Sequence, residues 1–348
     1  MGRRWVAQIG LLLATLLCGE VAARWYVHHT VGWQQISCSN GWRLRWAAHE
    51  IAGYHLQHDP ILGIRMPRNF KSRYPIWESQ SVHTNSLGAR GRVEVGYERT
   101  DKRRIVVIGD SYAFGFGVTS DENTYAAILG ELLPDTEVVN LAVPSYGTDQ
   151  MLLSYCEEGA RYKPDLLVVG VVGEDAARNI LSFYTFAKPM YVLEGQRLVL
   201  THVPVPTFAE LRSWEPWRPK LLDLTELVYC AIEERSGAAA ERAERITVAL
   251  WDEIARVAAE SHARPLFVYA PSTRELTSDE IPPTGPLLRQ FAARQGISAL
   301  DLTAEFRART DAGESIGWPH WNDHGHEVVA HGLAEMIERD HLLPSCSR

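Results

Sequence analysis

One serine in this chain has the sequence setting of a nucleophile. Four consecutive β-branched residues, Ile105 to Ile108, form an apolar run, and Ser111 comes after this run, separated from it by Gly109 and Asp110. Such a run is typical of a strand buried on both faces of a parallel sheet. Ligands of open α/β sheets bind at the carboxyl ends of the strands, and Ser111 lies just past that end. A strand-to-helix turn with a capping serine is the structural alternative.

A second group of polar side chains lies near the other end of the sequence. His320, Asp323, His324 and His326 fall within seven residues. A metal site is one interpretation, but the cluster lacks a His-x-x-x-His pair on a single continuous helix. Ester hydrolysis offers another use, because a nucleophilic serine needs a base and histidine commonly supplies it. We expect neither a metal nor a cofactor.

Four segments together resemble a known family. The stretch GDSYAFGFGV (109–118) resembles the first motif of the SGNH/GDSL hydrolases, which are serine esterases and acyl hydrolases with a flavodoxin-like core. The segments DPILG (59–63) and TNSLGARG (84–91) resemble the part that precedes the nucleophile strand in many bacterial members. The stretch WPHWNDHGH (318–326) is similar to the family's last motif. The resemblance implies that Ser111 is the nucleophile, His320 the base and His326 a structural histidine.

The chain departs from the family pattern beside the expected base. Trp318 stands where the resemblance implies an aspartate, which would fix the imidazole tautomer. Asp311, Glu314 or Asp323 could replace this acid from elsewhere in the loop. A Ser-His dyad, oriented by a backbone carbonyl, is the alternative. Asp323, near a helix start, could instead serve the helix dipole.

The blocks that the resemblance assigns to the oxyanion hole also differ from the pattern. Ser145 stands where glycine is expected, with Gly147 nearby, and Glu174 replaces an asparagine. An ionised glutamate would repel an oxyanion unless it were protonated or turned away, and Asn179 lies about one helical turn further on. We expect Ser111, Ser145, Gly147 and Asn179 to form the oxyanion hole.

From Arg104 onward, predicted strands alternate with predicted helices, and these elements must position the candidate residues. Alternating strand and helix patterns favour a parallel, doubly wound sheet, so we predict a flavodoxin-like three-layer α/β/α core. Predicted strands span 104–108, 137–141, 165–172, 265–270 and 297–302, and predicted helices span 124–133, 148–162, 239–261, 286–294 and a last segment after Asn322.

The remaining segments predict the domain organisation. We expect a leader or anchor at residues 1–23, an extension packed on the core at 24–100, and the hydrolase-like domain at 101–342. An insertion at about 180–235 breaks the alternation. It contains a predicted hairpin with its turn at Glu194-Gly195, and Trp214 and Trp217, and we expect it to overhang the catalytic edge.

The N-terminal segment predicts export. A basic start is followed by an apolar stretch and by small residues up to Ala23, which is typical of a signal peptide. An uncleaved anchor is the alternative, with membrane association through residues 5–23. We expect a periplasmic, extracellular or membrane-anchored protein.

Four cysteines remain after removal of the leader and allow three disulfide pairings. Cys156 is expected to be buried.

Composition limits the partners. The net charge of −8 gives no reason to expect nucleic acid. With the family resemblance, we predict a serine esterase or acyl hydrolase that cleaves acyl or acetyl esters of small molecules, glycans or lipids through an acyl-enzyme on Ser111. A catalytically impaired binding or scaffold protein, and an acyltransferase acting on a cell-surface glycan, are the alternatives.

Overall fold

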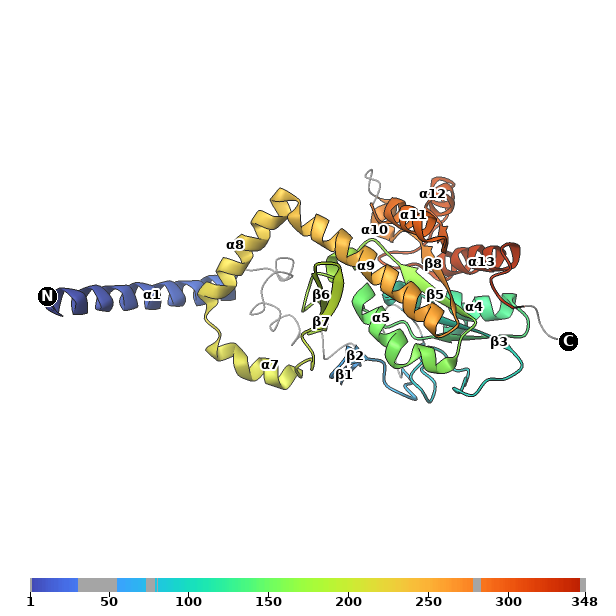
Figure 1. Cartoon of the computed structure of the whole chain (residues 1–348), viewed down its shortest axis with the longest axis horizontal. Helices are drawn as coiled ribbons and strands as arrows, with labels where there is room; N and C mark the ends of the chain where they lie inside the picture. The colour runs from blue at the N-terminus through green and yellow to red at the C-terminus, as the bar shows by residue number, and fades with distance from the viewer. Residues whose placement is uncertain (1, 31–54, 73–78, 80, 278–282, 345–348) are drawn as a thin grey trace.

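A five-stranded parallel sheet forms the centre of the protein (Figure 1). The structure is a computed structural model that describes residues 2–30, 55–72, 79, 81–277 and 283–344. The strand order is β4-β3-β5-β8-β9. The strands span Arg103–Ile108 (β3), Thr136–Asn140 (β4), Leu166–Val171 (β5), Arg264–Tyr269 (β8) and Ser298–Asp301 (β9). The predicted three-layer α/β/α fold is therefore confirmed.

Helices cover both faces of this sheet. On one face, α4 (Tyr125–Leu132) packs against α13 (Asp323–Arg339). On the other face lie α5 (Thr148–Glu157), α9 (Ala238–Glu260) and α11 (Thr284–Gln295), with α5 against α9. The short helices α3 (Ser111–Phe114), α6 (Asp175–Arg178), α10 (Thr273–Leu276) and α12 (Thr303–Asp311) and the 3-10 turns η2 (Asp121–Asn123) and η3 (Gly159–Tyr162) complete the core.

The order in which the chain adds strands to the sheet reverses at β3. The next strand, β4, lies on one side of β3, and the following strand, β5, lies on the other. Such a switch point separates the loops that follow the neighbouring strands and leaves a crevice between them. The loop after β3 carries Ser111, and the loop after β5 carries Glu174. The topology therefore brings these two segments, far apart in the sequence, to one edge.

The described part of the N-terminal extension packs on the core. Strands β1 (Gln57–Asp59) and β2 (Gly63–Arg65) form an antiparallel pair. Leu62 and Ile64 are buried in the main hydrophobic core, and the carbonyl oxygen of Ile64 accepts a hydrogen bond from the Tyr146 hydroxyl at 2.7 Å. The buried Arg90 guanidinium pairs with Asp121. Residues 31–54 of the expected extension lie outside the described residues.

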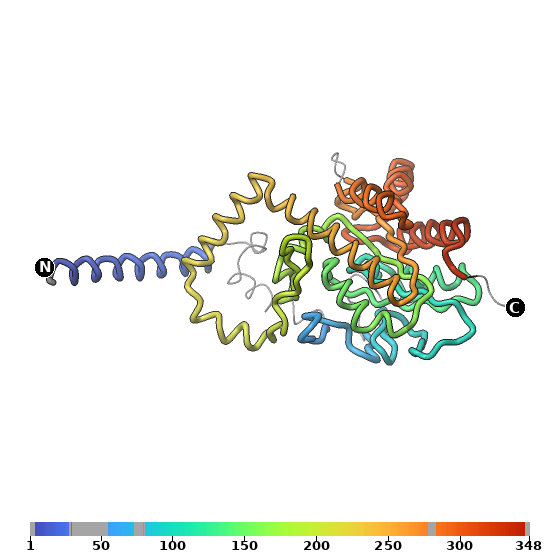
Figure 2. The backbone as a smooth tube through the Cα atoms, viewed as in Figure 1, coloured from blue at the N-terminus to red at the C-terminus, as the bar shows by residue number. Residues whose placement is uncertain are grey.

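The insertion contains more helix than the sequence patterns predicted. It holds the hairpin β6 (Met190–Glu194) and β7 (Arg197–Thr201), then α7 (Phe208–Trp214), η4 (Glu215–Trp217) and α8 (Lys220–Ser236). The register pairs Glu194 with Arg197, so the turn is Gly195-Gln196 instead of Glu194-Gly195. Figure 2 shows α7 and α8 extending from the core toward the N-terminal helix.

The N-terminal helix is longer than the expected leader. Helix α1 spans Gly2–Thr30, so the boundary expected at residue 23 falls inside it. By length and composition, Arg4–Val27 could cross a membrane, and a signal sequence has the same properties. Cys156 is exposed, contrary to expectation, because it lies near the end of α5. Cys38 and Cys346 lie outside the described residues.

Candidate active site

Ser111 begins a one-turn helix directly after the central strand. Gly109 permits this turn, because a Cβ at that position would lie 2.3 Å from the Cβ of Ala113. The Asp110 side chain caps α3 by accepting a hydrogen bond from the Tyr112 N–H at 2.9 Å. The serine side chain is thus held at the carboxyl end of β3 and is almost completely buried.

His320 reaches Ser111 from the loop between α12 and α13. Its Nε2 lies 3.0 Å from the Ser111 Oγ, which is hydrogen-bonding distance. The imidazole is flanked by the rings of Tyr112 and Phe116, with centroids at 4.7 and 5.0 Å. The Tyr112 hydroxyl also donates to the carbonyl oxygen of Pro319 at 3.1 Å. The structure therefore brings together the two expected residues and fixes the loop that carries the histidine.

Two glycines allow this loop to approach the serine. Gly117 has φ +86°, and a Cβ there would lie 2.6 Å from the carbonyl oxygen of Trp321. Gly317 has φ +111°, and a Cβ there would lie 2.3 Å from the carbonyl oxygen of His320. Both positions favour glycine because L-residues rarely adopt these angles and because no side chain fits.

The environment of His320 favours its neutral form. Burial lowers the pKa of His320 to about 4, with the Asp110 carboxylate opposing the shift and the Arg178 and Arg274 cations adding to it. A neutral imidazole can accept a proton from the serine hydroxyl. At neutral pH the histidine therefore has the protonation state that a general base needs.

Two of the three candidate orienting acids, Asp323 and Glu314, bond to groups other than His320. Asp323 accepts hydrogen bonds from the Thr119 N–H at 2.7 Å and from Asn123 at 2.9 Å. It is the first residue of α13, where a carboxylate also favours the helix dipole. These bonds also tie α13 to the loop after α3.

Glu314 and Asp311 lie at the surface. The Glu314 carboxylate pairs with His324 at 2.6 Å and with Arg309 at 3.2 Å. Asp311, the last residue of α12, is exposed. The Trp318 side chain, at the position where the family pattern has its acid, is 63% exposed. The orienting role proposed for Glu314 thus competes with two other partners.

The three histidines of the C-terminal motif have different surroundings. His324 faces Glu314 at the surface, whereas His326 is fully buried and its Nδ1 accepts the Tyr125 N–H at 3.2 Å. Burial lowers the pKa of His326 to about 3. No group of three metal-ligating side chains occurs in the part of the chain that the structure describes.

Ser145 occupies the turn between β4 and α5 in a left-handed conformation. Its φ is +69°, a value that is easy for glycine and costly for other residues. This geometry explains why the family pattern has glycine at this position. The Ser145 hydroxyl lies 2.9 Å from the Thr185 Oγ1, so a contact with the insertion stabilises the turn.

Gly147 and Asn179, expected in the oxyanion hole, make hydrogen bonds to neighbouring elements of the fold. The Gly147 N–H donates to the Gln150 side chain at 3.3 Å. The Asn179 amide is fully buried and donates to the hydroxyls of Thr148 at 3.1 Å and Thr247 at 2.9 Å. The Gly147 bond lies within the first turn of α5, whereas the Asn179 bonds join the end of α6 to α5 and α9. We therefore do not include these two groups in the proposed oxyanion hole.

A buried arginine, which the sequence analysis missed, ties the catalytic loops together. The Arg178 guanidinium pairs with Asp110 at 2.7 Å and with Asp175 at 3.0 Å. The same nitrogen donates to the carbonyl oxygen of Tyr146 at 3.0 Å. Arg178 therefore links the loops after β3, β4 and β5. The i,i+3 spacing of Asp175 and Arg178 on a short helix was the available signal.

Glu174 lies at the edge of the sheet where the family pattern has asparagine. Its Oε2 is buried, and no described residue makes a hydrogen bond to it. Burial raises the pKa of Glu174, and the carboxylates of Asp110 and Glu275 raise it further, whereas Arg178 opposes the shift. These surroundings favour the protonated carboxyl, which can donate a hydrogen bond.

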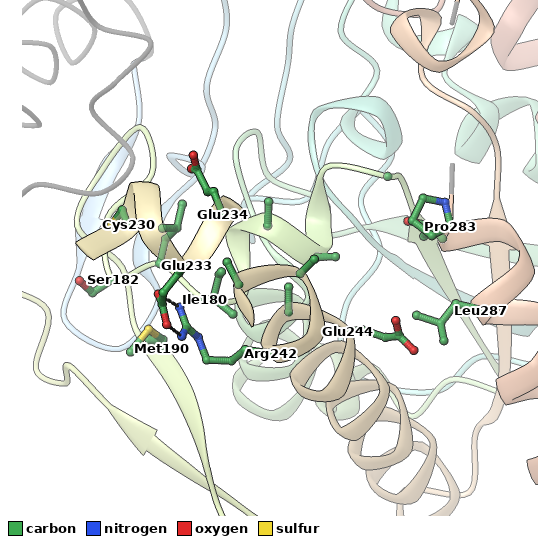
Figure 3. Close-up of a pocket in the computed structure, with 18 of the residues that line it drawn as sticks. Ile180, Ser182, Met190, Cys230, Glu233, Glu234, Arg242, Glu244, Pro283 and Leu287 are labelled. Carbon is green, nitrogen blue, oxygen red and sulfur yellow. Dashed lines mark hydrogen bonds and ion pairs between the residues drawn. The ribbon is translucent and has the colours of Figure 1, made fainter. Parts of the chain in front are cut away.

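A cavity of about 610 Å³ adjoins the loop that carries Glu174 (Figure 3). Gly173 and Glu275 line it, and a Cβ at Gly173 would lie within 1.9 Å of the Glu275 carboxylate. Figure 3 shows Pro283 and Leu287 on one side of the cavity and Met190 on the other. The remaining lining residues include Ala176, Ala177, Ile180, Leu181, Ala239, Ala240 and Ala243.

The fold places the paired serine and histidine at a switch point of a parallel sheet. A family model described as the GDSL-like lipase/acylhydrolase family matches residues 107–328, more than half of the chain. The chain therefore belongs to this family, and it is an ester-bond hydrolase. A comparison with curated proteins finds no match.

Solved structures with a similar fold include several hydrolases. One titled TesA has 13% identity and a TM-score of 0.41, covering 68% of this chain and 99% of that one. A catalytic mutant of an acetylxylan esterase from Geobacillus stearothermophilus has 13% identity and a TM-score of 0.43, covering 68% and 94%. An alpha/beta hydrolase from the metagenome of Lake Arreo, Spain, has 16% identity and a TM-score of 0.43, covering 70% and 97%. The family assignment rests on the family model.

Proposed function

We propose that the protein hydrolyses esters through an acyl-enzyme on Ser111, with His320 as the general base. The observation that most directly supports this proposal is the distance of 3.0 Å between the Ser111 Oγ and the His320 Nε2. His320 takes the hydroxyl proton while the Oγ bonds to the ester carbonyl carbon. The carbon–oxygen bond to the alcohol then breaks, and His320 returns the proton to the leaving alcohol. A water molecule, activated by the same histidine, releases the acid.

The oxyanion in this proposal is stabilised from three neighbouring loops. The backbone N–H groups of Ser111 and Ser145 and the protonated carboxyl of Glu174 are the donors. Support comes from their positions after β3, β4 and β5, which are adjacent strands. A neutral carboxylic acid can serve as such a donor when its surroundings keep it protonated. Arg178 acts as a positioning residue, since it bonds to all three loops.

The proposed substrate carries an apolar acyl group. The cavity next to Gly173 has mostly apolar walls and ends near the loop of Glu174. Burial of methylene groups there would contribute about 0.8 kcal/mol each to binding. Carboxylates of Glu226, Glu234 and Glu244 also line the cavity and disfavour an anionic group in it. The substrate class is therefore a neutral acyl ester.

The proposed location is outside the cytoplasm. Helix α1 has the length and composition of an export signal or an anchor, and it precedes the catalytic domain in the chain. Export brings the domain to esters of the cell envelope, in keeping with the acyl or glycan substrates expected from the family resemblance.

The test of this function uses the Ser111→Ala variant. Wild-type protein should react with a fluorophosphonate probe and hydrolyse p-nitrophenyl acetate. The variant should lose labelling and nearly all turnover, because the only proposed nucleophile is removed. Circular dichroism of the variant should show that the fold is retained. Equal turnover in the variant would exclude Ser111, and an unlabelled, inactive wild type would favour a scaffold role.

A further inference from the structure

Helix α8 of the insertion has no N-cap of its own. Its N-cap position is Pro219, which makes no side-chain hydrogen bond. Instead, the Glu20 carboxylate of α1 accepts hydrogen bonds from the N–H groups of Lys220 at 2.9 Å and Leu221 at 3.1 Å. The first N–H groups of a helix need such partners. The start of α8 is thus completed by a side chain of the N-terminal helix.

Further contacts hold one face of α1 against the insertion. Arg24, one turn beyond Glu20, forms an ion pair with it at 2.8 Å. The Arg24 guanidinium also donates to the carbonyl oxygens of Pro216 and Arg218, each at 3.3 Å. Ala23 is only 2% exposed and Val27 only 4%. Cleavage after Ala23 would remove Glu20 and break this arrangement.

The part of α1 between Ile9 and Leu17 is largely apolar and exposed. Trp5 and Trp25 lie about 30 Å apart along the helix axis, which is about the thickness of the hydrocarbon core of a bilayer. Both are exposed, as are Leu12 and Leu16 between them. Tryptophans favour the two membrane–water interfaces, so these two residues mark the ends of a span.

The position of this span in the bilayer determines how close the N-terminus of α8 lies to the membrane surface. Glu20 precedes Trp25 by about 7 Å along the helix, so the groups that it caps lie close to the outer interface. Trp214 and Trp217, in the segment just before α8, are 55% and 86% exposed. Backbone polar groups near a membrane need partners within the protein, and Glu20 and Arg24 supply them here.

We infer that α1 is kept as a permanent anchor and that η4 and the first turn of α8 lie in the interfacial layer of the bilayer, with Trp214 and Trp217 among the lipid headgroups. The partner of this surface is the membrane that α1 enters. The insertion is then a platform that holds the catalytic domain at a fixed orientation to the lipid surface. This inference does not depend on the proposed catalytic roles.

The first experiment determines the N-terminus of the mature protein. The full chain, with a C-terminal tag, is isolated from membranes and analysed by intact-mass spectrometry. We expect a chain that retains Glu20 and that carbonate does not extract but detergent does. A mature chain that begins at Arg24 would overturn the permanent anchor.

The second experiment tests the capping contact. Glu20→Ala should lower the Tm of the detergent-solubilised full chain by about 2–4 °C, because the α8 N-terminus loses its cap. Glu131→Ala, which changes an exposed glutamate on α4, is the matched control and should leave the Tm unchanged. Equal Tm values for the Glu20 variant and the wild type would contradict the contact.

The third experiment locates the platform. The full chain is reconstituted into phosphatidylcholine vesicles with bromine on the acyl chains near the headgroups. Bromine-sensitive tryptophan emission should fall in the Trp214→Phe/Trp217→Phe variant, because two of the tryptophans placed at the interfaces are removed. Trp251→Phe, in the core, should leave that emission unchanged. The same quenching in the double variant and the wild type would overturn the interfacial placement.

Discussion

The proposed catalytic pair consists of two side chains 209 positions apart in the sequence. Ser111 is held by a glycine turn and a capping aspartate, and His320 by the rings of Tyr112 and Phe116. Burial by these aromatic rings has an electrostatic consequence, since it removes water from the imidazole and disfavours its charged form. The same packing therefore sets both the position and the protonation state of the base.

His320→Ala should lower kcat/KM for p-nitrophenyl acetate by about 10²–10⁴-fold, the range typical of a general base. His324→Ala should stay near the wild type, because His324 contacts Glu314 at the surface. The pH dependence of the wild type is a separate test of His320. Because burial lowers the pKa of His320 to about 4, the imidazole stays neutral, and able to accept a proton, below pH 6. The activity of the wild type should therefore fall only as the pH drops toward 4. A midpoint near pH 6.5 would contradict this environment.

Glu174 should act through its protonated form. Glu174→Ala should lower kcat by about 10²–10³-fold, as for loss of one oxyanion donor. Because the pKa of Glu174 is raised, wild-type activity should decline as the pH rises and the carboxyl ionises. Glu174→Gln keeps a donor without a charge, so its kcat should lack this alkaline decline. Identical pH profiles for the glutamine variant and the wild type would exclude the proposed role.

At the scale of elements, the short helix α6 joins the catalytic loops. Arg178 on α6 bonds to Asp110, Tyr146 and Asp175, and Lys188, also buried, pairs with Asp149 of α5. A buried charge is tolerated only where partners compensate for lost hydration. The departures at Ser145 and Glu174 therefore sit in loops that a paired arginine already holds in place.

Arg178→Ala should lower the free energy of unfolding by about 3–5 kcal/mol, because the buried carboxylates of Asp110 and Asp175 lose their partner. Urea denaturation measures this change. Arg256→Ala, which breaks an exposed ion pair with Glu253 on α9, is the control and should cost less than about 1 kcal/mol. Similar losses in the two variants would contradict the central role of Arg178.

At the scale of the whole molecule, the insertion connects the core to the N-terminal helix. Its helix α8 contacts α1 at one end and continues through Gly237 into α9, which packs on the sheet (Figure 1). The cavity lies where α8 and α9 meet α6 and α11. The shape of this cavity thus depends on elements that are far apart in the sequence.

Filling the cavity should change the preference for acyl chain length. Ala177→Leu places a larger side chain in its wall, and kcat/KM for a long-chain p-nitrophenyl ester relative to the acetate should fall by about 10-fold. Ala238→Leu, on the exposed start of α9 and outside the cavity, is the matched control and should leave the ratio unchanged. An unchanged ratio in the Ala177 variant would remove the cavity from substrate binding while leaving the catalytic pair intact.

The sequence alone was sufficient to predict the sheet and to single out the two residues of the proposed catalytic pair, which the structure places in contact. The strand at 104–108 and the helix after Asn322 could be predicted because local hydrophobic periodicity depends on neighbouring residues. The predicted strands agree with β3, β4, β5, β8 and β9 to within a residue or two. Ser111 and His320 could be found because each lies in a recognisable motif.

Only the tertiary structure decided how the other polar groups are used. Asn179 has a suitable side chain and position in the sequence, yet its amide bonds to Thr148 and Thr247. The pKa of Glu174 is raised because the side chain is buried and because carboxylates from the segments after β3 and β8 lie near it. Hydrogen-bond partners and burial depend on which segments meet in space, and local sequence does not carry that information. For the same reason, the capping of α8 by Glu20 became evident only when α1 and the insertion were seen in contact.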